Sequence, residues 1–112
     1  MDKSEDVEIK CWCNGNKRSE VQLKNGIAEG LRTDWYESGA KKSECKYSTG
    51  RITGIANTWY ESGQMKFEIP FKIGARHGVE IKWSESGKIE SEDFYEKGSP
   101  KRKLPLNYTS KK

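Results

Sequence analysis

The stretch Trp35-Tyr36-Glu37-Ser38-Gly39 recurs along the chain as Trp59-Tyr60-Glu61-Ser62-Gly63 and Trp83-Ser84-Glu85-Ser86-Gly87. Each copy begins 24 residues after the previous one. A fixed period of this length indicates a repeat architecture, in which each unit buries its apolar surface against its neighbours. Stacked repeats present extended surfaces for binding. The repeat therefore decides the fold and favours binding over catalysis.

The glycines follow the same period. All 11 of them fall in three columns, and the repeat extends over about four copies. The first copy departs from the pattern at Cys11-Trp12-Cys13-Asn14 and the fourth ends after Gly98, as end units of a repeat array do. The columns are Gly15, Gly39, Gly63 and Gly87; Gly26, Gly50, Gly74 and Gly98; and Gly30, Gly54 and Gly78.

Each unit is predicted to be a β-hairpin. A short β-branched and aromatic segment precedes a loop that ends in glycine, which is typical of a type I turn followed by a residue at positive φ. Gly15, Gly39, Gly63 and Gly87 and the tryptophans Trp35, Trp59 and Trp83 are thus assigned structural roles in the repeat. Residues 48–54, with two glycines, are predicted as the connecting turn. The expected fold is all-β, an elongated antiparallel meander of about eight strands. The strands are expected near 7–13, 17–24, 31–36, 41–47, 55–60, 64–71, 79–84 and 88–95.

Alternation along the strands predicts one apolar and one charged face, because every second side chain lies on the same side. Pro70 predicts a bulge or an irregular strand end. Asp93 falls at an apolar position of the pattern and Phe94 at a polar one. Either the last strand caps the sheet or its register changes there. The sheet either curls over its tryptophans or is covered by a second surface. The apolar set is Leu31, Thr33, Trp35, Ile55, Asn57, Trp59, Val79, Ile81 and Trp83, with Val21, Leu23, Cys45, Tyr47, Met65, Phe67, Ile69 and Phe71 on the return strands. The charged set is Arg18, Glu20, Arg32, Asp34, Lys42, Glu44, Lys46, Lys66, Glu68, Glu80 and Lys82.

Length and charge divide the chain into an acidic segment 1–10 with the start of the first strand, a repeat domain 11–98 and a basic tail 99–112. Residues 97–112 hold six Lys or Arg and no acid. The tail is either a disordered end or a contact for nucleic acid, anionic lipid or an acidic partner. The repeat domain is close to neutral and is therefore not expected to bind the phosphate backbone of a nucleic acid. The polar start and the lack of an apolar run near ~20 residues predict a cytoplasmic protein.

The cysteines and glutamates carry the candidate chemistry. Cys11, Cys13 and Cys45 are expected to be reduced and to pack as small apolar residues. The alternative is a metal site formed by these cysteines and His77. We expect His77 to be solvated in a turn instead. No metal or cofactor is predicted. The column Glu20, Glu44, Glu68 and Glu92 is assigned to cross-strand charge pairing on the solvated face rather than to acid–base catalysis. No catalytic site is predicted.

Partner contacts are expected on the charged face, where aromatic and arginine side chains concentrate binding energy. Tyr36 and Tyr60 lie there beside lysines, as partner anchors or as ordinary cross-strand packing. The candidate partner-binding residues are Tyr36, Tyr60, Arg18, Arg32, Lys42, Lys66 and Phe94.

The aligned Trp-Tyr-Glu-Ser-Gly, Lys-x-x-Glu and Gly-x-x-x-Gly segments resemble the bacterial variant of the MORN repeat. The resemblance covers roughly residues 11–98 and is closest in the second and third copies. It implies a string of hairpins in one elongated sheet. The chain also looks like the YwqK-family antitoxins built from such repeats, from bacteria or phages. That likeness implies a non-catalytic monomer or weak homo-oligomer whose partner is another protein, such as a toxin. Nucleic acid or an anionic membrane is the alternative partner.

Overall fold

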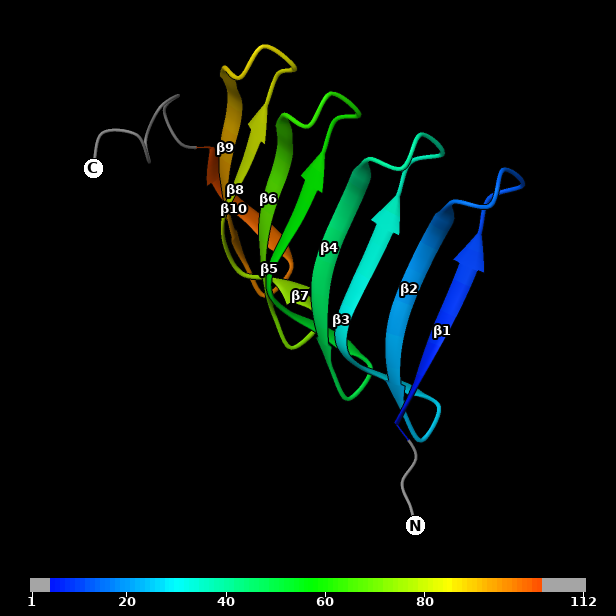
Figure 1. Cartoon of the computed structure of the whole chain (residues 1–112). Helices are drawn as coiled ribbons and strands as arrows, with labels where there is room; N and C mark the ends of the chain where they lie inside the picture. Colours follow the sequence, from blue (N-terminus) through cyan, green and yellow to red (C-terminus); the bar gives the residue numbers. More distant parts are fainter. Residues whose placement is uncertain (1–4, 104–112) are drawn as a thin grey trace.

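The computed structural model describes residues 5–103, with side chains through Pro100, as a single antiparallel sheet (Figure 1). Nine of its ten strands follow one another side by side in chain order, and the two-residue β7 pairs with β6. The all-β meander predicted from the repeat is therefore confirmed. The strands are β1 Glu5–Cys11, β2 Lys17–Lys24, β3 Ile27–Trp35, β4 Lys41–Ser48, β5 Arg51–Trp59, β6 Met65–Lys72, β7 Ala75–Arg76, β8 Gly78–Trp83, β9 Ile89–Glu96 and β10 Ser99–Lys103.

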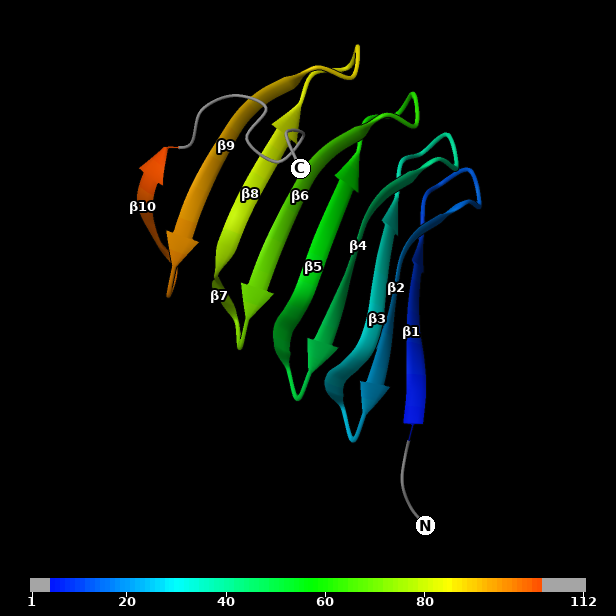
Figure 2. The same ribbon diagram turned by 90° about the vertical axis from the view of Figure 1, so that its left-hand side faces the viewer.

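The sheet forms one layer with overall extents of 50 × 33 × 21 Å. Its strands bend along their length, as the two views show (Figures 1 and 2). Among the described residues no helix is present that could cross a membrane. Because residues 5–103 form no second layer, neither face of the sheet is covered by another part of this described segment.

The hairpin loops have the predicted conformation. In the second copy the Tyr36 N–H donates to the Ala40 carbonyl at 2.8 Å, and the Gly39 N–H donates to the Tyr36 carbonyl at 2.9 Å. Gly39 and Gly63 have φ of 100° and 98°. Both therefore occupy the left-handed region that glycine enters without strain.

The connections between hairpins are tighter than predicted. Residues 48–54 are not one turn, because β5 begins at Arg51. Only Thr49 and Gly50 form the turn, with φ of 49° and 81°. Two consecutive residues at positive φ define the type I′ hairpin turn, whose twist matches that of the flanking strands. Gly54 lies inside β5, where the β4–β5 register is irregular, and not in the turn.

The assignment of side chains to one apolar and one charged face is wrong. In β3 and β4, Thr33 lies opposite Glu44 and Arg32 opposite Cys45. The cause is a bulge at Asp34/Trp35, which shifts the register by one residue. A shift of one residue moves every following side chain of the return strand to the other face. The same irregularity occurs in the other three hairpins.

Each face therefore mixes apolar and charged strands. The first, here the glutamate face, carries across its centre the row Ile9, Glu20, Thr33, Glu44, Asn57, Glu68, Ile81 and Glu92. The most buried described side chains lie in this row: Thr33 is 8% exposed, Ile81 6% and Glu92 0%. The second, here the tyrosine face, carries Arg32, Asp34, Ser43, Cys45, Tyr47, Thr58 and Phe67, and on β9 Asp93 and Tyr95.

The glutamate column consequently lies on the more buried face, not on the solvated one. Glu92 in β9, opposite Ile81 of β8, has no exposed area, whereas the side chains of Glu20 and Glu44 remain 32% and 29% exposed. Lys17 and Lys41 pair with these two carboxylates at 2.7 and 3.5 Å. The prediction of cross-strand pairing is therefore wrong for Glu20 and Glu44, whose ion pairs form within a strand at a spacing of three residues.

The last two hairpins contain the predicted irregularities. Pro70 sits in β6 opposite the break between β7 and β8, where its carbonyl accepts the His77 N–H at 3.0 Å. Phe94 lies opposite Val79 on the glutamate face, and Asp93 lies opposite Glu80. Ser99–Lys103 pairs with β9, so the sheet continues into the segment assigned to the basic tail. Residues 104–112 of that tail and residues 1–4 lie outside the described residues.

The cysteines are less buried than predicted. Cys11 and Cys13 are exposed and only Cys45 is partly covered. Burial raises the pKa of the Cys45 thiol, partly offset by Arg32. Cys11 and Cys13 belong to the N-terminal hairpin, where β1 is the outermost of the described strands. His77 is half-buried between β7 and β8 rather than fully solvated.

Candidate binding surface

A repeated pairing of cations with aromatic rings lies at the loop end of the hairpins. Lys42 Nζ lies 5.7 Å from the Tyr36 ring centroid, and Lys66 Nζ lies 5.3 Å from that of Tyr60. In the first copy Arg18 takes the same place over Trp12 at 5.6 Å. Cations at this distance from a ring face are attracted to it. The predicted neighbourhood of tyrosines and lysines is thus present in the structure.

The hydroxyl groups of these tyrosines are used within the sheet. Tyr36 donates to the Trp59 carbonyl at 2.7 Å, and Tyr60 donates to the Trp83 carbonyl at 2.8 Å. Trp12 Nε1 makes the corresponding bond to the Trp35 carbonyl at 3.2 Å. Each aromatic residue therefore ties its hairpin to the next one. The sequence analysis did not predict these bonds between hairpins. The recurrence of an aromatic residue every 24 positions was the one feature that could have indicated them.

Three of the predicted partner-binding residues meet in one place. A shallow hollow of about 300 Å³ lies between the first two hairpins, lined by Trp12, Arg18, Arg32, Asp34, Trp35, Lys42 and Ser43. Arg18 and Lys42 are exposed there. The bulge in each return strand turns these cations toward the tyrosine face, beside Asp34 and Ser43.

The charge in this hollow is partly compensated. Arg32 Nη2 lies 3.2 Å from Asp34 Oδ1, and the hydrogen bond to Asp34 raises the pKa of the Arg32 guanidinium. Ser43 Oγ donates to Asp34 Oδ2 at 2.9 Å. Arg32 is therefore held in a fixed position, whereas Arg18 and Lys42 supply the cationic groups that a partner could contact.

The other predicted residues lie elsewhere. Tyr60 and Lys66 repeat the arrangement one hairpin further along the tyrosine face. Phe94 is on the opposite face, in β9. The seven residues proposed for partner binding thus do not form one patch.

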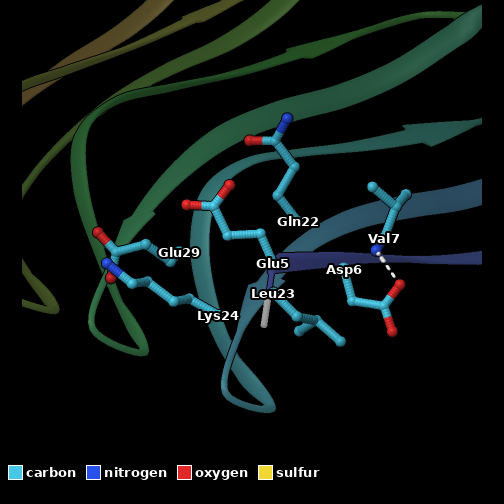
Figure 3. A pocket seen from close by; sticks show the side chains of 7 residues that line it. All are labelled: Glu5, Asp6, Val7, Gln22, Leu23, Lys24 and Glu29. Carbon is cyan, nitrogen blue, oxygen red and sulfur yellow. Dashed lines mark hydrogen bonds between the residues drawn. The ribbon is translucent and has the colours of Figure 1, made fainter. Parts of the chain in front are cut away.

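The glutamate face presents a different surface. Strands β1, β3 and β5 carry half-exposed aliphatic side chains there, namely Val7 45%, Ile9 49%, Leu31 44% and Ile55 53% exposed. A second hollow of about 290 Å³ opens between β1 and β2 and is lined by Glu5, Asp6, Val7, Gln22, Leu23, Lys24 and Glu29 (Figure 3). Within the described residues no group of three or more His, Cys, Asp or Glu is placed to hold a metal ion.

Comparison with known families identifies the repeat. The MORN repeat variant matches residues 52–72 and 76–97, which are the third and fourth hairpins. These two segments are therefore similar to MORN repeats, a family of repeats generally associated with binding and not with catalysis. The matched residues include the fourth hairpin and do not reach the second hairpin, which consists of β3 and β4. No curated protein matches the chain.

Proposed function

We propose that this chain is a non-catalytic protein-binding module of the cytoplasm that inhibits another protein, as an antitoxin does. The observation that supports it is the hollow on the tyrosine face, where exposed Arg18 and Lys42 lie over aromatic rings. Arg, Tyr and Trp are the residues in which binding energy at protein interfaces concentrates. A partner that fits this hollow presents acidic groups to it.

The test is a pull-down from the native host with affinity-tagged chain, followed by calorimetry on the partner retained. Arg18→Ala with Lys42→Ala is expected to weaken binding at least tenfold, about 1.4 kcal/mol. Both side chains are exposed, so the double variant should keep the fold. Leu31→Ser with Ile55→Ser is the matched control on the glutamate face, and it should bind normally.

Two outcomes would contradict the proposal. If no protein is retained at comparable stoichiometry, the chain is not a protein-binding module of this kind. If the control loses binding and the Arg18/Lys42 variant keeps it, the half-exposed aliphatic residues of the glutamate face form the binding surface instead. Inhibition itself is checked by adding the chain to the purified partner and measuring the partner's activity.

A second candidate is binding of single-stranded nucleic acid or an anionic membrane. The column of cations paired with aromatic rings favours it, because bases stack on aromatic side chains while cations contact phosphates. Fluorescence anisotropy with a labelled oligonucleotide and flotation with anionic vesicles would test it. Binding should fall steeply with salt and fall again in Arg18→Gln/Lys42→Gln/Lys66→Gln. Salt-independent or absent binding would exclude this candidate.

A further inference from the structure

β1 is an open edge of the sheet. Among the described residues it pairs only with β2, and all seven of its residues are exposed. The Val7 N–H points away from β2 and donates to the neighbouring Asp6 Oδ1 at 2.9 Å (Figure 3). Since backbone groups alternate sides along a strand, Ile9 and Cys11 also direct their N–H and C=O groups away from β2. These groups form a template for another strand.

The sequence of β1 is complementary to itself about Ile9. If two copies pair antiparallel at this residue, Ile9 lies opposite Ile9, and each Glu8 lies opposite a Lys10. Val7 lies opposite Cys11 at both ends. The residues with outward-directed backbone groups then form the hydrogen-bonded pairs, and opposite charges face each other on the other side of the strand.

Other arrangements are less favourable. Antiparallel pairing centred on Glu8 brings two glutamates directly opposite each other, which is destabilising. In the pairing centred on Ile9, no like charges meet among residues 7–11. Val7 and Ile9, which are 45% and 49% exposed in one copy, become partly covered by the second.

We propose that β1 pairs with β1 of a second copy of this chain, antiparallel and centred on Ile9, to form a symmetric dimer. The two sheets become continuous, and a twofold axis normal to the sheet keeps both glutamate faces on one side. Five paired residues a side make an interface below the usual size of stable complexes. The dimer is therefore weak and concentration-dependent, and Asp6 opposes it by bonding the Val7 N–H in the free chain.

Analytical ultracentrifugation over a range of concentrations tests the pairing. The natural chain should show a monomer–dimer equilibrium. Glu8→Lys and Lys10→Glu should each raise the dimer Kd about tenfold or more, because like charges then face each other. The double exchange Glu8→Lys/Lys10→Glu keeps the net charge and restores both opposite pairs, so its Kd should return toward the natural value.

Cross-linking tests the register. Residues opposite each other in a hydrogen-bonded pair have Cα atoms about 5.5 Å apart, which suits a disulfide. In a chain with Cys13→Ser and Cys45→Ser, Val7→Cys should form a cross-linked dimer with Cys11 of the second copy under mild oxidation. Glu5→Cys, which meets Cys11 only if Glu8 is the centre, should not. Circular dichroism checks that both variants fold.

A natural chain that stays monomeric at every concentration would overturn the proposal and leave the edge to a strand of a different protein. A dimer that cross-links through Glu5→Cys and not Val7→Cys would overturn the register. A dimer that responds to neither the charge exchange nor the cysteines would place the interface elsewhere, and the proposal would again fail.

Discussion

At the scale of single residues, the aromatic positions of the repeat link one hairpin to the next. Tyr36 and Tyr60 each contact a lysine through the ring and a carbonyl of the following hairpin through the hydroxyl. In the fourth copy the equivalent position is Ser84, whose Oγ bonds, among the described residues, only to Ser86 and Lys88 of its own loop. The series of links therefore ends at the last hairpin.

Removing one of these hydroxyl groups should weaken the sheet modestly. Tyr36→Phe keeps the ring over Lys42 but loses the bond to the Trp59 carbonyl. We expect a loss of about 0.5–1.5 kcal/mol in the free energy of unfolding, measured in urea. Tyr95→Phe is the control, because its ring also lies beside a cation, Arg76 at 5.1 Å, while its hydroxyl makes no hydrogen bond to another described residue. An equal effect in both variants would contradict the linking role of Tyr36.

Glu80 gives the fold a dependence on pH. Its carboxylate lies 3.3 Å from Arg76 Nη1 in an ion pair that is not aligned as a hydrogen bond. Burial raises the pKa of Glu80; Arg76 lowers it and Asp93 raises it further. Because the folded pKa exceeds the unfolded one, the folded state binds the proton more tightly, and ionisation of Glu80 opposes folding as the pH rises through the folded pKa.

Glu80→Gln should therefore be more stable than the natural chain at pH 7. The difference should shrink as the pH is lowered through the folded pKa of Glu80, where the natural side chain becomes protonated. Urea unfolding of both chains from pH 7 to pH 4 measures this difference. If the variant is the less stable chain at pH 7, the ion pair with Arg76 outweighs burial.

At the scale of elements, the sequence predicted the hairpins and their glycine loops but not the faces. The 24-residue period and the glycine after each aromatic box indicated where the chain turns, and Gly39 has the expected positive φ. The bulge at Asp34/Trp35 has no separate sequence signal, because Lys42, the extra residue, resembles its neighbours. Because this extra residue was not recognised, Cys45 and Glu44 were each assigned to the wrong face of the sheet.

The candidate binding surface could be predicted only in part, because the bulges also decide which residues of neighbouring hairpins lie together. Contacts between neighbours in one repeat, such as Lys42 with Tyr36, follow from local spacing and were found as expected. The grouping of Arg18 and Arg32 beside Lys42 depends on two hairpins and two bulges. Phe94 was placed on the wrong face because the register change carries it to the side of Val79.

The turn between β6 and β7 is the least favourable of the type I′ turns. Ile73 has φ of 48° and is 63% exposed, although β-branched residues are strained in the left-handed region. The corresponding turn after β2 uses Asn25-Gly26, the preferred pair. Ile73→Asn is expected to raise the free energy of unfolding by about 0.5–1 kcal/mol, measured by thermal and urea unfolding.

The reciprocal change provides the control for this turn. Asn25→Ile should destabilise the chain by a similar amount, since it introduces the same strain at φ of 53°. If Ile73→Asn destabilises the chain instead, the Ile73 side chain makes a contact that outweighs the backbone strain, and the hollow that it lines with Arg51 would be the place to look for it.

At the scale of the whole molecule, a single-layer sheet holds together through nearest neighbours. Each hairpin contacts the one before and the one after, so stability is distributed along the sheet rather than concentrated in one core. The most buried side chains, Ile81 and Glu92, lie in β8 and β9, whereas every residue of β1 is exposed. The two ends of the molecule are therefore unequal, and the N-terminal end should open first.

Native-state hydrogen exchange can measure this gradient. At low protein concentration, where self-association is negligible, amides of β1 and β2 should exchange at least about tenfold faster than those of β6 and β8, because local opening of an edge hairpin exposes little apolar surface. Thr33→Ala, in the central row, should accelerate exchange most in β2, β3 and β4, the strands beside it. Uniform protection across all strands would show instead that the sheet unfolds as one cooperative unit, in which a loss at Thr33 is felt equally at Ile81.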